Sequence, residues 1–206
     1  MSRLQRVIQQ ATQSFHDYDY AAAKNEVENF FWTELADNYL EMAKMRLYNE
    51  DSATHESARH TLYQLLLATL KLFAPFLPHV TEAIYQGLFA KTEGNTSIHT
   101  SNWPTVDETL IDETAEATGN TLLAIATATR RYKSDRTLSP GAELTRLQIA
   151  TDSPTLTQAL QAAQDDLRSI TRAQHIETVA HLDPTLEHTA ANDTLTLAFE
   201  LPPLEG

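Results

Sequence analysis

The thirty-one residues from Tyr18 to Tyr48 constrain the fold of this chain more than any other stretch. Apolar and aromatic side chains recur there at three- and four-residue spacing, which places them on one face of a long amphipathic helix. The residues at this spacing are Val27, Phe30, Phe31, Glu34, Leu35, Asn38, Tyr39, Met42 and Ala43. Trp32 and Tyr39 each need a hydrogen-bond partner when buried, so the helix carries more than a plain packing face. We predict that the Phe30-Phe31-Trp32 cluster belongs to a helical core.

Composition restricts the class of protein. With 206 residues, 42% of them apolar, the chain is long enough to bury a core. It contains no run approaching the ~18 consecutive apolar residues of a membrane span. It has no cysteine, which excludes disulfides, thiolate zinc sites and cysteine nucleophiles. The first residues, MSRLQRVIQQ, contain no apolar signal-peptide core, so we expect a cytoplasmic protein without a membrane partner.

The charge balance is strongly acidic. Twenty-eight acidic residues against fifteen basic ones give a formal net charge of −13, and only five of the bases are lysines. An ordinary acidic domain is one interpretation, but the rarity of lysine and the twenty-seven threonines favour a halophilic source. Acidity by itself argues mildly against a nucleic-acid partner, because phosphate contacts require positive side chains. In molar salt the Debye length is only ~3 Å, so local arginine contacts can outweigh the net charge.

Periodicity and breakers predict a mainly α fold with two parts. The first, residues 1–138, is a five-helix bundle, and the second, residues 139–206, is a small α+β subdomain. Helices are expected at 2–16, from the turn at 17–19 to about 49, from 51 or 52 to 73, at 79–90, and from 107 to 136 with a bend at 119–120. After the turn at 139–141, strands are expected at 144–149, 175–180 and 194–201 and a helix at 154–170.

Particular residues define the ends and faces of these elements. Ser2 is a candidate N-cap for the first helix. Pro78 suits the first turn of the fourth helix, where its missing N–H costs nothing. We also expect Trp103 and Pro104 to pack a polar loop back onto the bundle. The inward positions of the first helix are Leu4, Val7, Ile8 and Ala11.

Three segments carry a resemblance to a known family. They are FFWTELADNYLEMAK (30–44), APFLPHVTEAIYQGLF (74–89) and SIHTSNWP (97–104). Together they resemble the C-terminal helical domain of valyl-tRNA synthetases, a class I aminoacyl-tRNA synthetase family. The Pro-Phe-x-Pro-x-x-x-Glu pattern is shared with the isoleucine, leucine and methionine enzymes, whereas Phe-Phe-Trp followed by Asp-Asn-Tyr-Leu-Glu points to the valine enzyme. The resemblance covers residues 2–138 well and the last third weakly.

The resemblance implies an anticodon-binding role. The bundle would receive the anticodon stem-loop of tRNA(Val) while the catalytic domain of the same chain performs aminoacylation with ATP and magnesium. The His-x-Gly-His and Lys-Met-Ser-Lys-Ser signatures of that catalytic domain do not occur here, so we expect this fragment to be non-catalytic, without cofactor, and monomeric. The alternatives are the corresponding domain of isoleucyl-tRNA synthetase, or a helical protein-interaction module with no nucleic-acid role.

The candidate tRNA-binding residues are basic or aromatic. The segment RRYKSDRTL (130–138) resembles the family's basic stretch at the end of the last bundle helix. Its cations suit phosphate contact, and Tyr132 suits base stacking. A solvated helix end whose cations oppose the C-terminal dipole is the structural alternative. The full set of candidates is Arg130, Arg131, Tyr132, Lys133 and Arg136, then Arg3, Arg6, Lys44 and Arg46.

Signals for catalysis and metal binding are weak. The histidine pairs 55/60, 175/181 and 181/188 all miss the i, i+4 spacing that places two imidazoles on one metal, so no metal site is predicted. No serine lies in a Gly-x-Ser-x-Gly elbow, and no catalytic residue is assigned. Arg168 and Arg172 are further possible tRNA contacts, although Asp165 and Asp166, expected on a solvated helix face, lie beside them.

Overall fold

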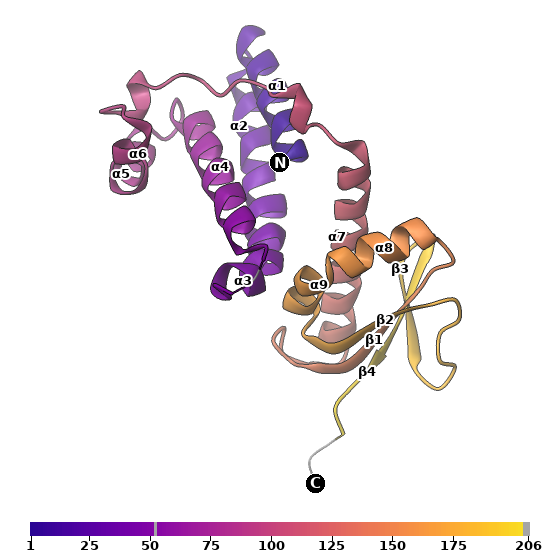
Figure 1. Cartoon of the computed structure of the whole chain (residues 1–206). Helices are drawn as coiled ribbons and strands as arrows, with labels where there is room; N and C mark the ends of the chain where they lie inside the picture. Colours follow the sequence, from indigo (N-terminus) through magenta and orange to yellow (C-terminus); the bar gives the residue numbers. More distant parts are fainter. Residues whose placement is uncertain (52, 204–206) are drawn as a thin grey trace. The chain divides into compact units, whose positions relative to one another are not determined.

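The computed structural model describes residues 1–51 and 53–203, and its elements pack into two units (Figure 1). Unit 1 consists of Met1–Tyr39 and Glu50–Glu113, and unit 2 of Leu40–Asn49 and Thr114–Gly206. The chain therefore enters unit 2 at Leu40, returns to unit 1 at Glu50, and enters unit 2 again at Thr114. The division into domains at residue 138 stays a prediction, and the contacts group the long helix that precedes this point with the residues that follow it.

Unit 1 is entirely helical within the described residues. Its α-helices are α1 (Ser2–His16), α2 (Tyr20–Asn29), α4 (His55–Phe73), α5 (Pro78–Leu88) and α6 (Ala90–Glu93). A π-helical segment, η1 (Phe30–Tyr39), follows α2, and two 3-10 turns, η2 (Ile98–Thr100) and η3 (Glu108–Leu110), lie in the last part of the unit.

The first helix forms because its apolar residues recur on one face. All four predicted inward residues are buried, as the helical spacing requires, namely Leu4, Val7, Ile8 and Ala11. The predicted N-cap is wrong, because Met1 precedes the helix and Ser2 is already its first residue. The Ser2 hydroxyl instead accepts a hydrogen bond from the Asp112 N–H at 3.0 Å, which fixes the start of α1 against the end of unit 1.

The segment predicted as one long helix changes its hydrogen-bond pattern twice. Asp19 caps α2 by accepting from the Ala22 N–H at 2.9 Å, and ten residues of π-helix then separate α2 from α3 (Leu40–Tyr48). The core assignment of the Phe-Phe-Trp cluster holds for Phe30 but is wrong for Trp32, which is 56% exposed. Residues two apart on a helix point to nearly opposite sides, so both rings cannot face one core.

Hydrogen bonds tie the second half of unit 1 together. The helix predicted from Asp51 or Ser52 begins at His55, and Ser52 lies outside the described residues. Pro78 occupies the first turn of α5 as predicted. One turn later the Glu82 carboxylate accepts from the Ser97 hydroxyl and the Ile98 N–H, both at 2.9 Å. The expected return of the polar loop is confirmed by the Trp103 indole, which donates to the α1 residue Thr12 at 2.9 Å.

Unit 2 combines helices with a small sheet. Its helices are α3, α7 (Glu113–Asp135, whose first residue is grouped with unit 1), α8 (Pro154–Ala162) and α9 (Gln164–Thr171). Among the described residues the sheet has four strands in the order β2-β1-β4-β3, namely β1 (Leu144–Ala150), β2 (Ala173–Val179), β3 (Glu187–Asn192) and β4 (Leu195–Glu200). β1 pairs in parallel with β2 and antiparallel with β4, and β3 pairs antiparallel with β4.

Several predicted boundaries in unit 2 require correction. The helix expected from 107 begins at Glu113 and runs without a break through 119–120. The helix expected at 154–170 is two helices, because the chain leaves helical geometry at Ala163. β3 was not predicted at all. The overall class is nevertheless confirmed, since a mainly helical chain ends in a small α+β part.

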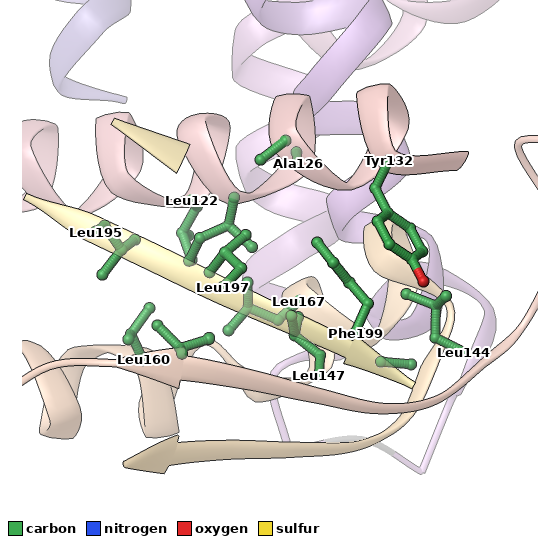
Figure 2. Close-up of a cluster of buried hydrophobic side chains, with 14 of the residues drawn as sticks. Leu122, Ala126, Tyr132, Leu144, Leu147, Leu160, Leu167, Leu195, Leu197 and Phe199 are labelled. Atoms are coloured by element: carbon green, nitrogen blue, oxygen red, sulfur yellow. The ribbon is translucent and has the colours of Figure 1, made fainter. Parts of the chain in front are cut away.

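The core of unit 2 lies between its helices and one face of the sheet (Figure 2). Alternation along β1 and β4 turns Leu147, Ile149, Leu197 and Phe199 into this core. The helices contribute Leu122, Ile125, Ala126, Tyr132, Leu160 and Leu167. Other strand positions carry polar groups, including Arg146, whose guanidinium lies within 4.0 Å of carboxylates of Glu177, Asp183 and Glu200.

None of the helices in the described part of the chain has the length and apolar character that crossing a membrane requires.

Candidate nucleic-acid interface

The basic segment at the end of α7 is divided between surface and core. Arg131 is exposed, whereas its neighbours Tyr132 and Lys133 are buried. Successive helical residues are about 100° apart, so a run of consecutive candidates necessarily spreads around the helix. Only part of the predicted tRNA-binding segment is therefore available to a ligand.

Tyr132 packs inside unit 2, which does not fit the expected role in base stacking. Its ring stacks on Phe199 with centroids 4.2 Å apart, and it is 4% exposed (Figure 2). The Arg136 guanidinium covers the ring, with its central carbon 3.7 Å from the ring centroid. Arg136 also donates to the Tyr132 carbonyl oxygen at 3.2 Å and forms an ion pair with Glu187 on β3. Both side chains thus join the end of α7 to the sheet.

Lys133 is also structural in its position. The side chain is buried, and its Nζ donates to the carbonyl oxygens of Thr171 at 2.9 Å and Pro140 at 3.1 Å. Burial, together with the positive charge of nearby Arg172, lowers the pKa of Lys133 from 10.5 to about 8. An ammonium group held in this way does not reach a phosphate on the surface, contrary to the sequence-based interpretation.

The two arginines at 130 and 131 differ in their surroundings. The Arg131 side chain is 76% exposed, and its Nε lies 3.9 Å from the Asp135 carboxylate. An exposed ion pair of this kind contributes at most about 1 kcal/mol, so a phosphate can replace Asp135 at little cost. Arg130 is half-buried and already interacts within the protein. Arg131 is therefore the member of the segment best placed for phosphate contact.

The remaining predicted cations all have carboxylate partners. In unit 1, Arg3 donates through Nε to Glu34 at 3.0 Å, and Arg6 lies 3.7 Å from Glu113. In unit 2, Lys44 lies 2.6 Å from Glu41 in an exposed pair along α3. Of the nine predicted site residues, Arg3 and Arg6 thus belong to unit 1 and the other seven to unit 2.

Arg46 is held more firmly than these. Its guanidinium donates two hydrogen bonds to the Asp166 carboxylate, at 2.7 and 3.1 Å, and both side chains are less than one fifth exposed. This pair joins α3 to α9, next to a hydrogen bond from the Ser169 hydroxyl to the Glu41 carbonyl oxygen. Burial raises the pKa of Asp166, although Arg46 opposes the shift. The expectation that Asp166 lies on a solvated helix face is wrong.

Exposed aromatic residues are the site candidates that sequence reasoning missed. Trp32 in η1, Tyr18 in the turn before α2 and Tyr48 at the end of α3 are 56%, 79% and 82% exposed. Exposed rings offer stacking surfaces for unpaired bases. For Trp32 the signal was present, because its position two residues after buried Phe30 directs it away from the core.

Residues 1–51 and 53–203 contain no group of three or more histidine or acidic side chains close enough together to hold a metal ion. The sequence also has no glycine-rich phosphate loop, and five glycines in total leave little room for one. The chemistry that these residues offer is binding through cations and aromatic rings.

Comparisons with known proteins agree on one family. The family model described as the anticodon-binding domain of tRNA ligase matches residues 1–149. The chain is 38% identical over 188 residues to a valine–tRNA ligase of Thermococcus kodakarensis, a match covering 91% of this chain and 21% of the relative. It is 34% identical over 204 residues to the valine–tRNA ligase of Orientia tsutsugamushi, covering 98% of this chain and 24% of the relative. The chain thus spans less than a quarter of the length of either relative.

Proposed function

Because this chain belongs to the anticodon-binding domain family of tRNA ligases, we propose that it is the anticodon-binding part of a valine–tRNA ligase. The observation that carries the proposal is the family match over residues 1–149. It is supported by valine–tRNA ligases whose matches cover nearly the whole of this chain. In this role the chain holds the anticodon stem-loop of tRNA(Val) so that the acceptor end reaches the catalytic centre. Its energetic contribution is orientation of a bound substrate.

The nine candidate residues take two kinds of role in this proposal. Arg131 and Arg130 on α7, Arg3 and Arg6 on α1, and Lys44 on α3 contact phosphates. The ion pairs of Arg3, Arg6 and Lys44 are partly exposed, so exchanging a carboxylate for a phosphate costs little. The supporting residues are Tyr132, Lys133, Arg136 and Arg46, whose contacts within unit 2 hold α3, α7 and α9 in place.

The rest of the ligase supplies the chemistry. We assign ATP, magnesium and aminoacyl transfer to the catalytic domain of the parent chain. An apolar stripe on α5 and the residue before it supports a packed neighbour in the parent enzyme: Leu77, Val80, Ile84 and Leu88 recur at helical spacing and are each at least 40% exposed. Since the chain spans about a fifth of its relatives, the remaining part of the same polypeptide is the proposed occupant of this stripe.

Binding of tRNA by the 206-residue chain tests the proposal. We expect tighter binding of a tRNA with a valine anticodon than of the same tRNA carrying an isoleucine anticodon, measured by fluorescence anisotropy in molar and in low salt. Equal affinity would contradict the valine assignment, and no binding of either tRNA would favour a protein-interaction module instead.

A charge-reversal pair locates the interface. Arg131→Glu is expected to weaken binding at least tenfold, because it replaces an attraction to phosphate with a repulsion. Arg59→Glu is the matched control, since Arg59 is equally charged, 62% exposed, and lies on α4 in unit 1 outside the proposed contacts. Equal losses in both variants would show a general charge effect and remove Arg131 from the interface.

A further inference from the structure

Most arginines in this chain are paired with carboxylates, and two are not. Ion pairs involve Arg3, Arg6, Arg46, Arg59, Arg131, Arg136 and Arg146, and Arg130 has its own interactions. Arg168 and Arg172 have no ion pair with any described residue. In a chain with 28 acidic residues for 15 basic ones, such arginines are unexpected. They lie at the end of α9 and immediately after it.

The two arginines line one surface cavity of unit 2. The cavity has a volume of about 340 Å³ and lies where α3, the end of α9 and the start of β2 meet. Met45 and His175 line it with them, and Glu143 is the one carboxylate at its wall. The Gln174 amide donates to Glu143 at 2.9 Å, so this carboxylate already has a partner at the edge. Glu143 keeps its negative charge, but the two guanidinium groups outnumber it, so the cavity presents net positive charge to a ligand.

One polar atom of this cluster is buried without a partner. The Nε of Arg168 is inaccessible to solvent and makes no hydrogen bond within the described structure. Unpaired buried donors are rare, because each loses its hydrogen bond to water without replacement. The fold therefore holds the Arg168 guanidinium beside the cavity without supplying an acceptor for its Nε.

The fold also maintains positive charge at this place. Arg172 adopts a left-handed backbone conformation, with φ 60°, and its N–H donates to the Arg168 carbonyl oxygen at 3.0 Å. A non-glycine residue in this conformation is strained, so the surrounding structure must hold it. Beneath it the Lys133 ammonium is fixed to the Thr171 carbonyl oxygen. Asp166, the acid nearest in sequence within α9, is bound by Arg46 on α3 and does not neutralise the cluster.

Stabilisation of the helix end does not explain this arrangement. Cations are favourable near a helix C-terminus, where carbonyl oxygens lack partners. At the end of α9, however, Lys133 donates to the Thr171 oxygen and the Arg172 N–H donates to the Arg168 oxygen. Those carbonyls are satisfied without either guanidinium. What remains to be explained is why two arginines without an ion pair to any described residue line the same cavity.

We propose that Arg168 and Arg172 bind a phosphate of the RNA backbone in this cavity, giving the α+β part of the chain its own contact to tRNA. This inference rests on the proposed function, because it takes tRNA as the ligand. Guanidinium groups match phosphate oxygens with paired N–H donors. His175 provides a further polar group, and Met45 provides an apolar surface beside the phosphate for a ribose.

The test is a double variant of the 206-residue chain, Arg168→Gln with Arg172→Asn. Glutamine preserves helix propensity within α9, and asparagine tolerates the left-handed conformation at 172. We expect tRNA binding to weaken roughly tenfold or more, with the slope of log affinity against log salt reduced by about 1 for the lost phosphate contact. The matched control, Arg59→Gln with Lys91→Gln, removes the same charge from exposed positions of unit 1 and should leave the slope unchanged.

The outcomes separate this inference from the proposed function. If the wild-type chain binds no tRNA, both fail. If wild type and double variant bind with the same affinity and slope, the phosphate site alone is overturned. Phenylglyoxal modification of the wild-type chain, read by mass spectrometry, gives a result even if the variant does not fold. Protection of Arg168 and Arg172 by tRNA is expected, and equal protection by millimolar inorganic phosphate would overturn the assignment to RNA.

Discussion

Lys133 is the side chain whose removal tests the physical account of unit 2 most directly. It is 2% exposed, and its ammonium donates to two carbonyl oxygens, those of Thr171 and Pro140. Burial and the proximity of Arg172 lower its pKa from 10.5 to about 8. The charged form is therefore less favourable in the folded chain than in the unfolded chain. Replacement by methionine removes the titrating group while keeping an unbranched apolar stem.

The sign of the pH effect follows from proton binding. Between about pH 8 and pH 10.5 the unfolded chain binds more protons at this lysine than the folded chain does, so stability rises with pH in this window. A shift from 10.5 to about 8 adds between about 2 and 3 kcal/mol to the free energy of unfolding from pH 7 to pH 10. We expect the wild-type value minus the Lys133→Met value to rise by this amount.

Urea unfolding followed by far-ultraviolet circular dichroism measures this difference at each pH. Both tryptophans, Trp32 and Trp103, lie in unit 1, so tryptophan fluorescence follows that unit separately. Lys91→Met is the matched control, because Lys91 is exposed on α6 in unit 1. The change with pH carries the test, since methionine also leaves two carbonyl oxygens without a donor. A difference independent of pH, or the same rise in the control, would refute the reasoning.

Three further measurements test the packing and the charge. Tyr132→Ala removes the stack on Phe199 and is expected to cost about 3–5 kcal/mol in urea unfolding, whereas Tyr132→Phe should cost less than about 1 kcal/mol; equal costs would contradict the stack. Arg46→Ala is expected to cost about 2 kcal/mol at pH 7, and less as the pH falls, because the largely buried Asp166 with its raised pKa then takes up a proton; a constant cost would contradict this. The wild-type melting temperature should be higher in molar potassium chloride than in dilute buffer, since salt screens a net charge of −13, and equal values would remove the halophilic expectation.

The elements that sequence predicted well are those with a strong apolar period. α1 has one face of small and branched apolar residues, and its bounds match the predicted range of 2–16. β1 and β4 alternate apolar and polar residues because one face of the sheet is buried. Local patterns specify such elements because the same pattern that forms the element also buries it.

The elements that sequence missed lack this agreement. β3 has the sequence EHTAAN and forms an edge of the sheet, where no residue is fully buried and no apolar alternation is required. Over ten residues, the spacing of apolar side chains does not distinguish a π-helix from an α-helix. The sequence therefore predicted η1 as α-helix. Both features depend on hydrogen bonds, which the side-chain pattern does not encode.

The candidate site was predictable by residue type but not by availability. A run of basic residues at 130–136 is unusual in an acidic chain, and this made the segment a reasonable candidate. The sequence does not show, however, that Lys133 is bound by carbonyl oxygens seven and thirty-eight positions further along the chain. Conversely, Arg168 and Arg172 look neutralised in sequence by Asp165 and Asp166. Burial of a charge depends on partners brought together by the fold, and no local pattern reports them.

Net charge is therefore a poor guide to whether this chain binds RNA. Its acidity predicts repulsion of phosphate at long range, but the pairing of individual cations decides the interaction at contact distance. Arg46, Arg136 and Arg146 are neutralised within the protein and add nothing to a binding surface. Arg131 pairs loosely, and Arg168 and Arg172 do not pair with any described carboxylate. A protein that neutralises most of its arginines internally concentrates its attraction for phosphate at the few that it leaves available.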